Sequence, residues 1–372
     1  MTYDPFERGQ NPVGVTTTTW RDKNRSRDLV VEVWYPATDA ARGQDLDPAT
    51  QDSFVVPGLS AEAGSTALQA AVRDADPQPG PHAAVLLVHG YAGHRRESTF
   101  MATHLASHGF VVASADISGS TFPDIKAIID SAKQEGRQFS RVEYQPILIA
   151  DRQGDIPFLV DSMIDNLDIS PDGLGITGAS FGGWASLLAP SLHAKVIASA
   201  PMCPSGGSTP TYPRDKNYAG QALDFDWGSD VATMFMVADR DSWLPLYGQI
   251  ELLRSVPGQK RMFVLEQADH NHFVDDVANG HEWLREFTAE LADVDIDGGV
   301  EWGCIARGMQ PASELTDGDK ALICWRGLCT AHMDAHLRGS QEAQAFFYGD
   351  VPAQTAERAI NIVEIRGEGA KS

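Results

Sequence analysis

The stretch Asp-Gly-Leu-Gly-Ile-Thr-Gly-Ala-Ser-Phe-Gly-Gly, residues 172–183, is the most informative part of the sequence. Within it, Gly178-Ala179-Ser180-Phe181-Gly182 fits the Gly-x-Ser-x-Gly pattern of a nucleophile elbow. A short apolar run precedes the motif, and the apolar residues 184–188 follow it as the start of a helix. A strand, a sharp turn and a helix are the setting that this motif requires. The pattern therefore predicts a strained turn that exposes the Ser180 hydroxyl at the edge of a sheet.

A serine hydroxyl becomes a strong nucleophile only when a neighbouring base takes its proton, so Ser180 needs partners. Two polar loops supply candidates. The apolar run 233–237 leads into a loop with Asp239 and Asp241, and the run 261–265 leads into a loop with His270 and His272. Loops at the carboxyl ends of strands are where an α/β sheet carries its chemistry. Two candidate acids and two candidate bases therefore follow from the pattern.

Further stretches resemble the α/β-hydrolase superfamily, in the branch of dienelactone hydrolases, platelet-activating-factor acetylhydrolases and cutinase-like polyester hydrolases. The resemblance covers about residues 15–290 and is more specific for fold and triad than for substrate. Two positions depart from the family pattern: Ala179 replaces the histidine of Gly-His-Ser, and Gln267 replaces the usual glycine before the base. Besides the elbow and the two polar loops, the resemblance is carried by Val33-Trp34-Tyr35-Pro36-Ala37, His89-Gly90-Tyr91-Ala92-Gly93 and Leu105-Ala106-Ser107-His108-Gly109-Phe110-Val111-Val112.

The resemblance implies the chain order serine, acid, histidine for the triad. Asp241 stands four residues before Pro245, as the acid does in many of these hydrolases, so Asp241 is favoured over the alternative Asp239. His270 ends a stretch that takes the place of Gly-Ala-x-His, so it is the expected base and His272 the second choice. The carboxylate would hold the imidazole in the tautomer that accepts the serine proton.

The resemblance also implies where the oxyanion would be held. The apolar run 83–88 leads into the loop 89–93, and the backbone N–H groups of Tyr91 and Phe181 are the expected donors. Aromatic residues crowd the expected rim, among them Trp184, Trp243 and Trp227, and they are candidates for the substrate pocket.

Strand-like and helical runs alternate along most of the chain, which predicts a mostly parallel twisted sheet flanked by helices. Residues 15–20 and 29–35 predict an N-terminal antiparallel hairpin, and a short helix is expected near 65–73. We expect one α/β-hydrolase domain over 1–372, with a core at about 15–290, a lid-like insertion at 204–230 and a C-terminal helical extension at 291–372. Within that extension, 320–347 reads as one long helix and 360–365 as an edge strand or a partner contact.

Composition restricts the partners. The net charge of −22, from 29 basic and 51 acidic residues, argues against binding nucleic acid or an anionic membrane. No run approaches the length of a membrane span, and the first residues lack the pattern of a signal peptide, so a cytoplasmic location is expected. Four cysteines in 372 residues suggest reduced thiols. His332 and His336 have a helical metal spacing, but Met333 occupies the place of the glutamate in His-Glu-x-x-His, so no metal is expected.

These observations predict a serine carboxylic-ester hydrolase that forms an acyl-enzyme and needs no cofactor. The resemblance to acetylhydrolases favours short acyl groups on a small-molecule or lipid ester. The alternatives are a polyester or lactone hydrolase, an amidase or acyltransferase with the same triad, and a hydrolase-fold binding protein without catalysis. An oligomer formed through the C-terminal extension is possible.

Overall fold

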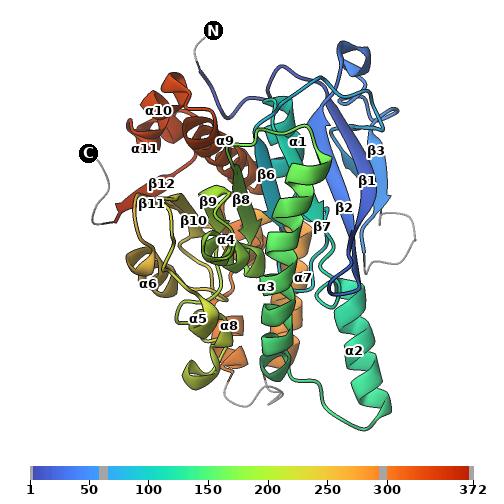
Figure 1. Ribbon diagram of the computed structural model, residues 1–372. Coiled ribbons are helices and arrows are strands. Elements are labelled where there is room, and N and C mark those ends of the chain that lie inside the picture. Colours follow the sequence, from blue (N-terminus) through green and yellow to red (C-terminus); the bar gives the residue numbers. More distant parts are fainter. Residues whose placement is uncertain (1–2, 58–65, 293–299, 368–372) are drawn as a thin grey trace.

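The computed structural model describes residues 3–57, 66–292 and 300–367, and a ten-stranded sheet forms its centre (Figure 1). Its strand order is β12-β11-β10-β9-β8-β6-β7-β2-β1-β5. The strands are β1 (Val13–Asp22), β2 (Arg27–Pro36), β5 (Val72–Arg73), β6 (Ala84–Val88), β7 (Val111–Ala115), β8 (Leu174–Ala179), β9 (Val196–Met202), β10 (Ala232–Ala238), β11 (Lys260–Leu265) and β12 (Ile362–Arg366).

The sheet is parallel at its centre and antiparallel near both edges. Strands β7, β6, β8, β9, β10 and β11 pair in parallel, whereas β1 and β2 form an antiparallel hairpin and β12 runs antiparallel to β11. The predicted mostly parallel sheet, its flanking helices and the N-terminal hairpin are thus confirmed, and 360–365 does supply an edge strand. Because the central strands run the same way, their carboxyl ends meet at one edge, where the loops after β6, β8, β9, β10 and β11 gather.

Helices cover both faces of the sheet, and strand residues alternate between two large hydrophobic clusters. Val85 and Leu87 of β6 face the side of α1 and α9, while Leu86 and Val88 face α3 and α4, which cross in front of the sheet in Figure 1. The helices are α1 (Thr99–Ser107), α2 (Phe122–Gln134), α3 (Arg141–Asn166), α4 (Phe181–Leu192), α5 (Tyr218–Ala222), α6 (Leu246–Ser255), α7 (Val277–Leu291), α8 (Trp302–Gly308), α9 (Gly318–Leu337), α10 (Gln341–Phe347) and α11 (Val351–Ala356).

Two local predictions were wrong. The described part of 65–73 is not helical: β4 (Thr66–Gln69) pairs with β3 (Asp52–Val55), and β5 joins the edge of the main sheet. The Gln69 side chain bonds Trp34 Nε1 and Asp52, so tertiary pairing overrides the helical propensity of this Ala-rich stretch. The predicted helix 320–347 is two helices, because Gly339 adopts φ +62° and Ser340 begins a new helix by accepting a hydrogen bond from the Ala343 N–H.

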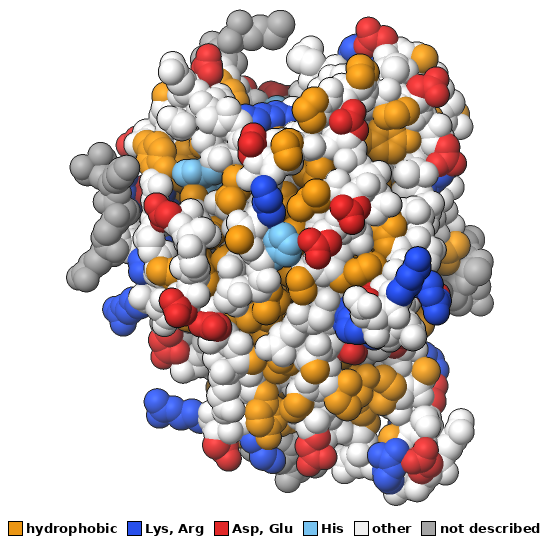
Figure 2. All heavy atoms as spheres, in the orientation of Figure 1, with side chains coloured by type: hydrophobic (Ala, Val, Ile, Leu, Met, Phe, Trp, Pro, Cys, Tyr) orange, Lys and Arg blue, Asp and Glu red, His pale blue; other side chains and the backbone are white. Residues whose placement is uncertain are grey.

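The surface carries charges of both signs. On the face drawn in Figure 2, acidic and basic side chains are interspersed and do not form a continuous basic surface. All four cysteines are free thiols. In the described ranges, none of the helices combines the length and apolar character needed to cross a membrane.

Candidate active site

Ser180 lies between β8 and α4 in a strained conformation. Its φ of 58° and ψ of −114° are unfavourable for a residue with a side chain, and such strain is typical of functional turns. A Cβ added at Gly178 or Gly182 would lie 2.1 or 1.9 Å from the carbonyl oxygen of Val88, at the end of β6. Glycine is therefore required at both positions, because strand and helix pass too close for any larger residue.

His270 lies beside Ser180, at the end of the loop that follows β11. Its Nε2 atom is 3.2 Å from Ser180 Oγ, and its Nδ1 atom is 2.9 Å from Asp241 Oδ2. Because a carboxylate only accepts, Nδ1 carries the proton and Nε2 is left to accept the serine hydroxyl. The other oxygen of Asp241 accepts hydrogen bonds from the backbone N–H groups of Trp243 and Leu244, at 3.0 and 2.7 Å. The structure thus brings Ser180, His270 and Asp241 into one hydrogen-bonded chain.

The electrostatic surroundings raise the affinity of His270 for a proton. Burial lowers the pKa of the imidazole, but the charge and hydrogen bond of Asp241, together with Cys203, outweigh it, so that the pKa lies well above its usual value. Asp241 itself is only 4% exposed, so its charge acts on His270 with little screening by solvent. This arrangement makes His270 a stronger base than an isolated imidazole.

The alternative acid and base contact other groups. Asp239 accepts a hydrogen bond from the Ala268 backbone N–H and lies 3.4 Å from Arg240, so it braces the loop next to Asp241. His272 is buried, its Nε2 lies 3.2 Å from the Thr316 carbonyl oxygen, and its ring packs edge-on against His281. Neither side chain has a described hydrogen bond to Ser180 or His270.

The loop after β6 passes next to Ser180, and the Gly90–Tyr91 peptide is held on one side by several donors. The Gly90 carbonyl accepts from His89 Nδ1 at 2.7 Å and from Arg152 Nη2 at 3.1 Å. The Ile117 backbone N–H donates to His89 Nε2, so the proton of this neutral imidazole is on Nδ1. Since the carbonyl and N–H of a trans peptide point in opposite directions, the Tyr91 N–H is turned away from Arg152. Phe181 is the first residue of α4, where the helix itself provides no acceptor for the N–H.

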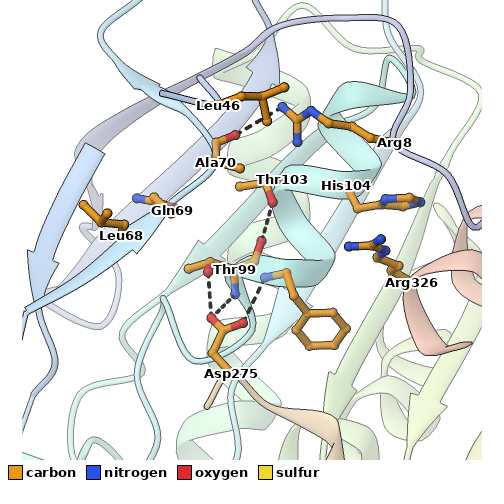
Figure 3. A pocket seen from close by; sticks show the side chains of 11 residues that line it. Arg8, Leu46, Leu68, Gln69, Ala70, Thr99, Thr103, His104, Asp275 and Arg326 are labelled. Carbon is orange, nitrogen blue, oxygen red and sulfur yellow. Dashed lines mark hydrogen bonds between the residues drawn. The ribbon is translucent and has the colours of Figure 1, made fainter. Parts of the chain in front are cut away.

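A buried carboxyl fixes the other side of this loop. Glu97 Oε1 accepts from the Gly90 N–H at 2.6 Å, and burial raises the pKa of Glu97 to about 8 against the opposing effects of the Gly90 hydrogen bond and of Arg152. The Asp275 N–H donates to the Glu97 carbonyl oxygen, which ties the loop to the segment after His270. A cavity of about 400 Å³ lies next to this hydrogen bond, and Thr99, Asp275 and Arg326 are among its lining residues (Figure 3). Ser180, Asp241 and His270 do not line it. In it, Asp275 caps the first turn of α1.

Several residues at the site were not assigned a role from the sequence. They are Glu97, Arg152, Cys203 and Asp269, of which the last three are buried and Glu97 is partly buried. Asp269 accepts from the N–H groups of His270 and Ser242, and burial and the nearby Asp241 raise its pKa to about 6. Cys203 directly follows β9, the strand next to the elbow strand. Its place at a strand end was the only signal in the sequence, because a lone arginine, glutamate or cysteine carries no motif.

The three tryptophans expected at the pocket have different positions. Trp243 lies at the site: its ring stacks on His270 with centroids 6.1 Å apart and meets Trp302 of α8 edge-on at 5.5 Å. Trp184 is fully buried, stacked on Phe181, and its indole N–H donates to the Ala219 carbonyl oxygen, so its contacts are with the protein interior. Trp227 packs in a hydrophobic cluster with β10 and α6, and its assignment to the pocket stays a prediction.

The segment 204–230 borders the site and is fastened to its neighbours. The Ser205 N–H donates to the Ser180 carbonyl oxygen, and Thr209 donates to the Trp243 carbonyl oxygen at 2.5 Å. Arg141 of α3 donates to the Thr211 carbonyl oxygen, and its guanidinium lies 4.5 Å from the centre of the Tyr212 ring. These contacts place the segment as a wall beside Trp243.

Comparisons with known proteins support the fold. No protein-family model matches the chain, and no curated protein matches its sequence. Among solved structures, the chain is similar to a ferulic acid esterase from Streptomyces cinnamoneus, with a TM-score of 0.60 and 20% sequence identity, over 89% of this chain and 92% of that one. Together with the order of the strands, this likeness shows that the chain adopts the α/β-hydrolase fold.

Proposed function

We propose that this protein is a serine carboxylic-ester hydrolase in which Ser180 is the nucleophile, His270 the general base and Asp241 the acid. The observation that carries the proposal is the hydrogen-bonded chain from Ser180 Oγ to His270 Nε2 and from Nδ1 to Asp241, built on a strained turn at Ser180. Its support is geometric, since nucleophile, base and orienting carboxylate are already within hydrogen-bonding distance. The esterase with a similar fold supports the same class of bond.

In the proposed mechanism, Ser180 Oγ attacks the ester carbonyl carbon while its proton moves to His270 Nε2. The backbone N–H groups of Tyr91 and Phe181 stabilise the oxyanion of the tetrahedral intermediate. His270 then protonates the departing alcohol, which leaves an acyl group on Ser180. A water molecule, deprotonated by His270, hydrolyses this acyl-enzyme and restores the hydroxyl. The steps use only groups of the protein chain, the ester and water.

We propose a preference for short acyl groups. Trp243, Trp302 and the fastened segment 204–230 form a wall beside His270, and that wall limits the length of a bound chain. Pockets of this kind are mostly apolar and bind by shape, so a bulky wall selects by size. Polyesters, lactones and aryl esters present the same carbonyl chemistry, and an amide bond or acyl transfer would use the same triad.

A labelling experiment separates a hydrolase from a catalytically inactive binding protein. A fluorophosphonate should attach to one serine, found at Ser180 by peptide mapping, and His270→Ala should abolish labelling while His272→Ala should only reduce it. His272→Ala is the matched control because it removes a neighbouring buried imidazole. A panel of p-nitrophenyl esters from acetyl to palmitoyl, with a feruloyl ester and an anilide, then defines the substrate. No labelling of the folded protein would contradict the proposal.

A further inference from the structure

Cys203 brings a thiol to the acid and base of the proposed triad. It follows the last residue of β9, adopts φ +34°, and its backbone N–H donates to the Met236 carbonyl oxygen of β10, so its position is fixed by the sheet. Its Sγ atom, a carboxylate oxygen of Asp241 and a ring nitrogen of His270 all lie within 4.8 Å of one another. No other such convergence of three or more metal-binding side chains was found among the described residues.

The chemistry of these three groups is that of a metal site for a borderline-soft cation. Thiolate, imidazole and carboxylate are the ligands that Zn²⁺ prefers, and three protein ligands with an open fourth position are common. In a tetrahedral zinc site, neighbouring ligand atoms are about 3.5 Å apart, given bond lengths of about 2.0–2.3 Å. The triangle of ligand atoms in the structure has sides of at most 4.8 Å, so small side-chain rotations bring it to this geometry. The same ligands suit Cd²⁺ and do not suit Mg²⁺, which requires oxygen.

We propose that Cys203, Asp241 and His270 form a binding site for Zn²⁺ and that the bound ion switches the enzyme off. The metal-binding part stands on these three residues alone, whereas the inhibitory part rests on the function proposed above. In this proposal Zn²⁺ is not a cofactor. It is a reversible inhibitor that competes with Ser180 for His270.

Binding of Zn²⁺ changes no oxidation state, so it needs no oxidant or reductant. Zn²⁺ bonds to Cys203 Sγ and the thiol proton is released to solvent, where buffer takes it up. If Zn²⁺ binds Nδ1 of His270, the proton on Nδ1 moves to Nε2, and a protonated Nε2 cannot accept the proton of Ser180. If it binds Nε2, it occupies the lone pair that the base needs. Either way, Ser180 loses its proton acceptor.

The other cysteines provide the controls. Cys304 is exposed and belongs to α8, while Cys324 and Cys329 are buried in α9. An exposed thiol is where adventitious zinc would bind, so Cys304→Ser is the matched control for Cys203→Ser. Serine has nearly the volume of cysteine, and Cys203→Ala is a second variant in case the serine hydroxyl disturbs the buried site.

Binding is tested first without turnover, in Ser180→Ala protein. Titration with Cd²⁺ should produce a thiolate-to-metal charge-transfer band with one ion per chain, present in the Cys304→Ser background and absent in the Cys203→Ser and Cys203→Ala backgrounds. A band that persists without Cys203, or no band at all, would overturn the site. This result does not depend on ester hydrolysis, so it distinguishes failure of the site from failure of the proposed function.

Inhibition is tested next, with each variant normalised to its own metal-free rate on p-nitrophenyl acetate. Zn²⁺ should inhibit the unmodified protein, and a chelator should reverse the inhibition, while Mg²⁺ should have no effect. Cys203→Ser should weaken inhibition by at least about 100-fold, because loss of even a supporting partner of a metal ligand costs about 10–100-fold in affinity. Cys304→Ser should be inhibited like the unmodified protein. Equal inhibition of Cys203→Ser and the unmodified protein would overturn the proposal.

Discussion

Arg152→Met tests whether a buried cation orients the loop 89–93, which carries the backbone N–H of Tyr91 that is expected to bind the oxyanion. Arg152 is fully buried in α3, and its Nη2 atom lies 2.9–3.3 Å from three acceptors: Ser120 Oγ and the carbonyl oxygens of His89 and Gly90. Its guanidinium also lies 4.5 Å from the centre of the Phe181 ring. Arg152 therefore contacts Phe181, which bears one expected oxyanion donor, and Gly90, which precedes Tyr91, the bearer of the other. Methionine keeps much of the length and apolar volume but removes every hydrogen bond.

The size of the effect follows from which bonds remain. A hydrogen bond from a charged group contributes about 1.5–3 kcal/mol, and complete loss of an oxyanion donor costs about 2.7–4 kcal/mol in kcat. The Gly90 carbonyl keeps the shorter bond from His89, so the loop is loosened but not released. We expect kcat to fall by about 10–100-fold with little change in KM, because the oxyanion is present only in the transition state.

Stability should respond differently from activity. Burial lowers the pKa of Arg152 to about 10, against the raising effect of Glu97, so the folded protein holds this cation at a cost. Replacing Arg152 by an apolar side chain removes this cost, but it also leaves Ser120 Oγ and the His89 carbonyl oxygen without this donor, which lowers stability. The assay is kcat and KM on p-nitrophenyl acetate, beside thermal unfolding and the affinity for a trifluoromethyl ketone that mimics the tetrahedral intermediate. A folded variant with unchanged kcat and unchanged ketone affinity would refute the reasoning.

Three further predictions concern the base, the acid and the wall. Asp241→Asn should lower kcat by about 10⁴-fold, because the amide no longer holds the correct imidazole tautomer, whereas Asp239→Asn should be far milder; a severe effect at Asp239 would reassign the acid. Because only neutral His270 accepts a proton and its pKa is raised, kcat/KM should rise with pH along a limb that lies above pH 6.5, and in Asp241→Asn the limb should move to lower pH. Esters of about C2–C6 acids should be preferred over longer ones, and Trp243→Ala should relax this preference as measured by the ratio of kcat/KM for acetyl and palmitoyl esters; an increase of kcat/KM from acetyl to palmitoyl in the unmodified protein would refute the wall.

The sheet and its order of elements could be predicted because they depend on patterns that the chain repeats. Alternating runs of apolar residues mark the strands, and the close approach at Gly178 and Gly182 leaves a motif of fixed spacing. The elements that were mispredicted depend either on distant partners or on the backbone conformation of one residue. The stretch 66–73 is extended because β3 and β1 pair with it, and the helical pattern after 320 is interrupted by a single glycine at positive φ.

Some residues of the candidate site could be predicted from the sequence and others could not. Ser180, Asp241 and His270 stand at strand ends with recognisable neighbours, so their meeting could be expected. Trp184 and Trp227 could not be told from Trp243 by sequence, because burial of a tryptophan on either side of a sheet uses the same apolar spacing. Glu97 and Arg152 act through hydrogen bonds to the backbone of the loop after β6, and such bonds leave no pattern in the sequence.

The turnover rate of Ser180→Ala on p-nitrophenyl acetate tests the central claim most directly. Ser180 makes its described side-chain hydrogen bond with His270, so removal of the hydroxyl should leave the fold and the melting temperature intact. We predict a loss of about 10⁴–10⁶-fold in kcat, the scale for the serine of a triad. A folded Ser180→Ala protein that hydrolyses the ester near the unmodified rate would contradict the assignment of Ser180 as the nucleophile.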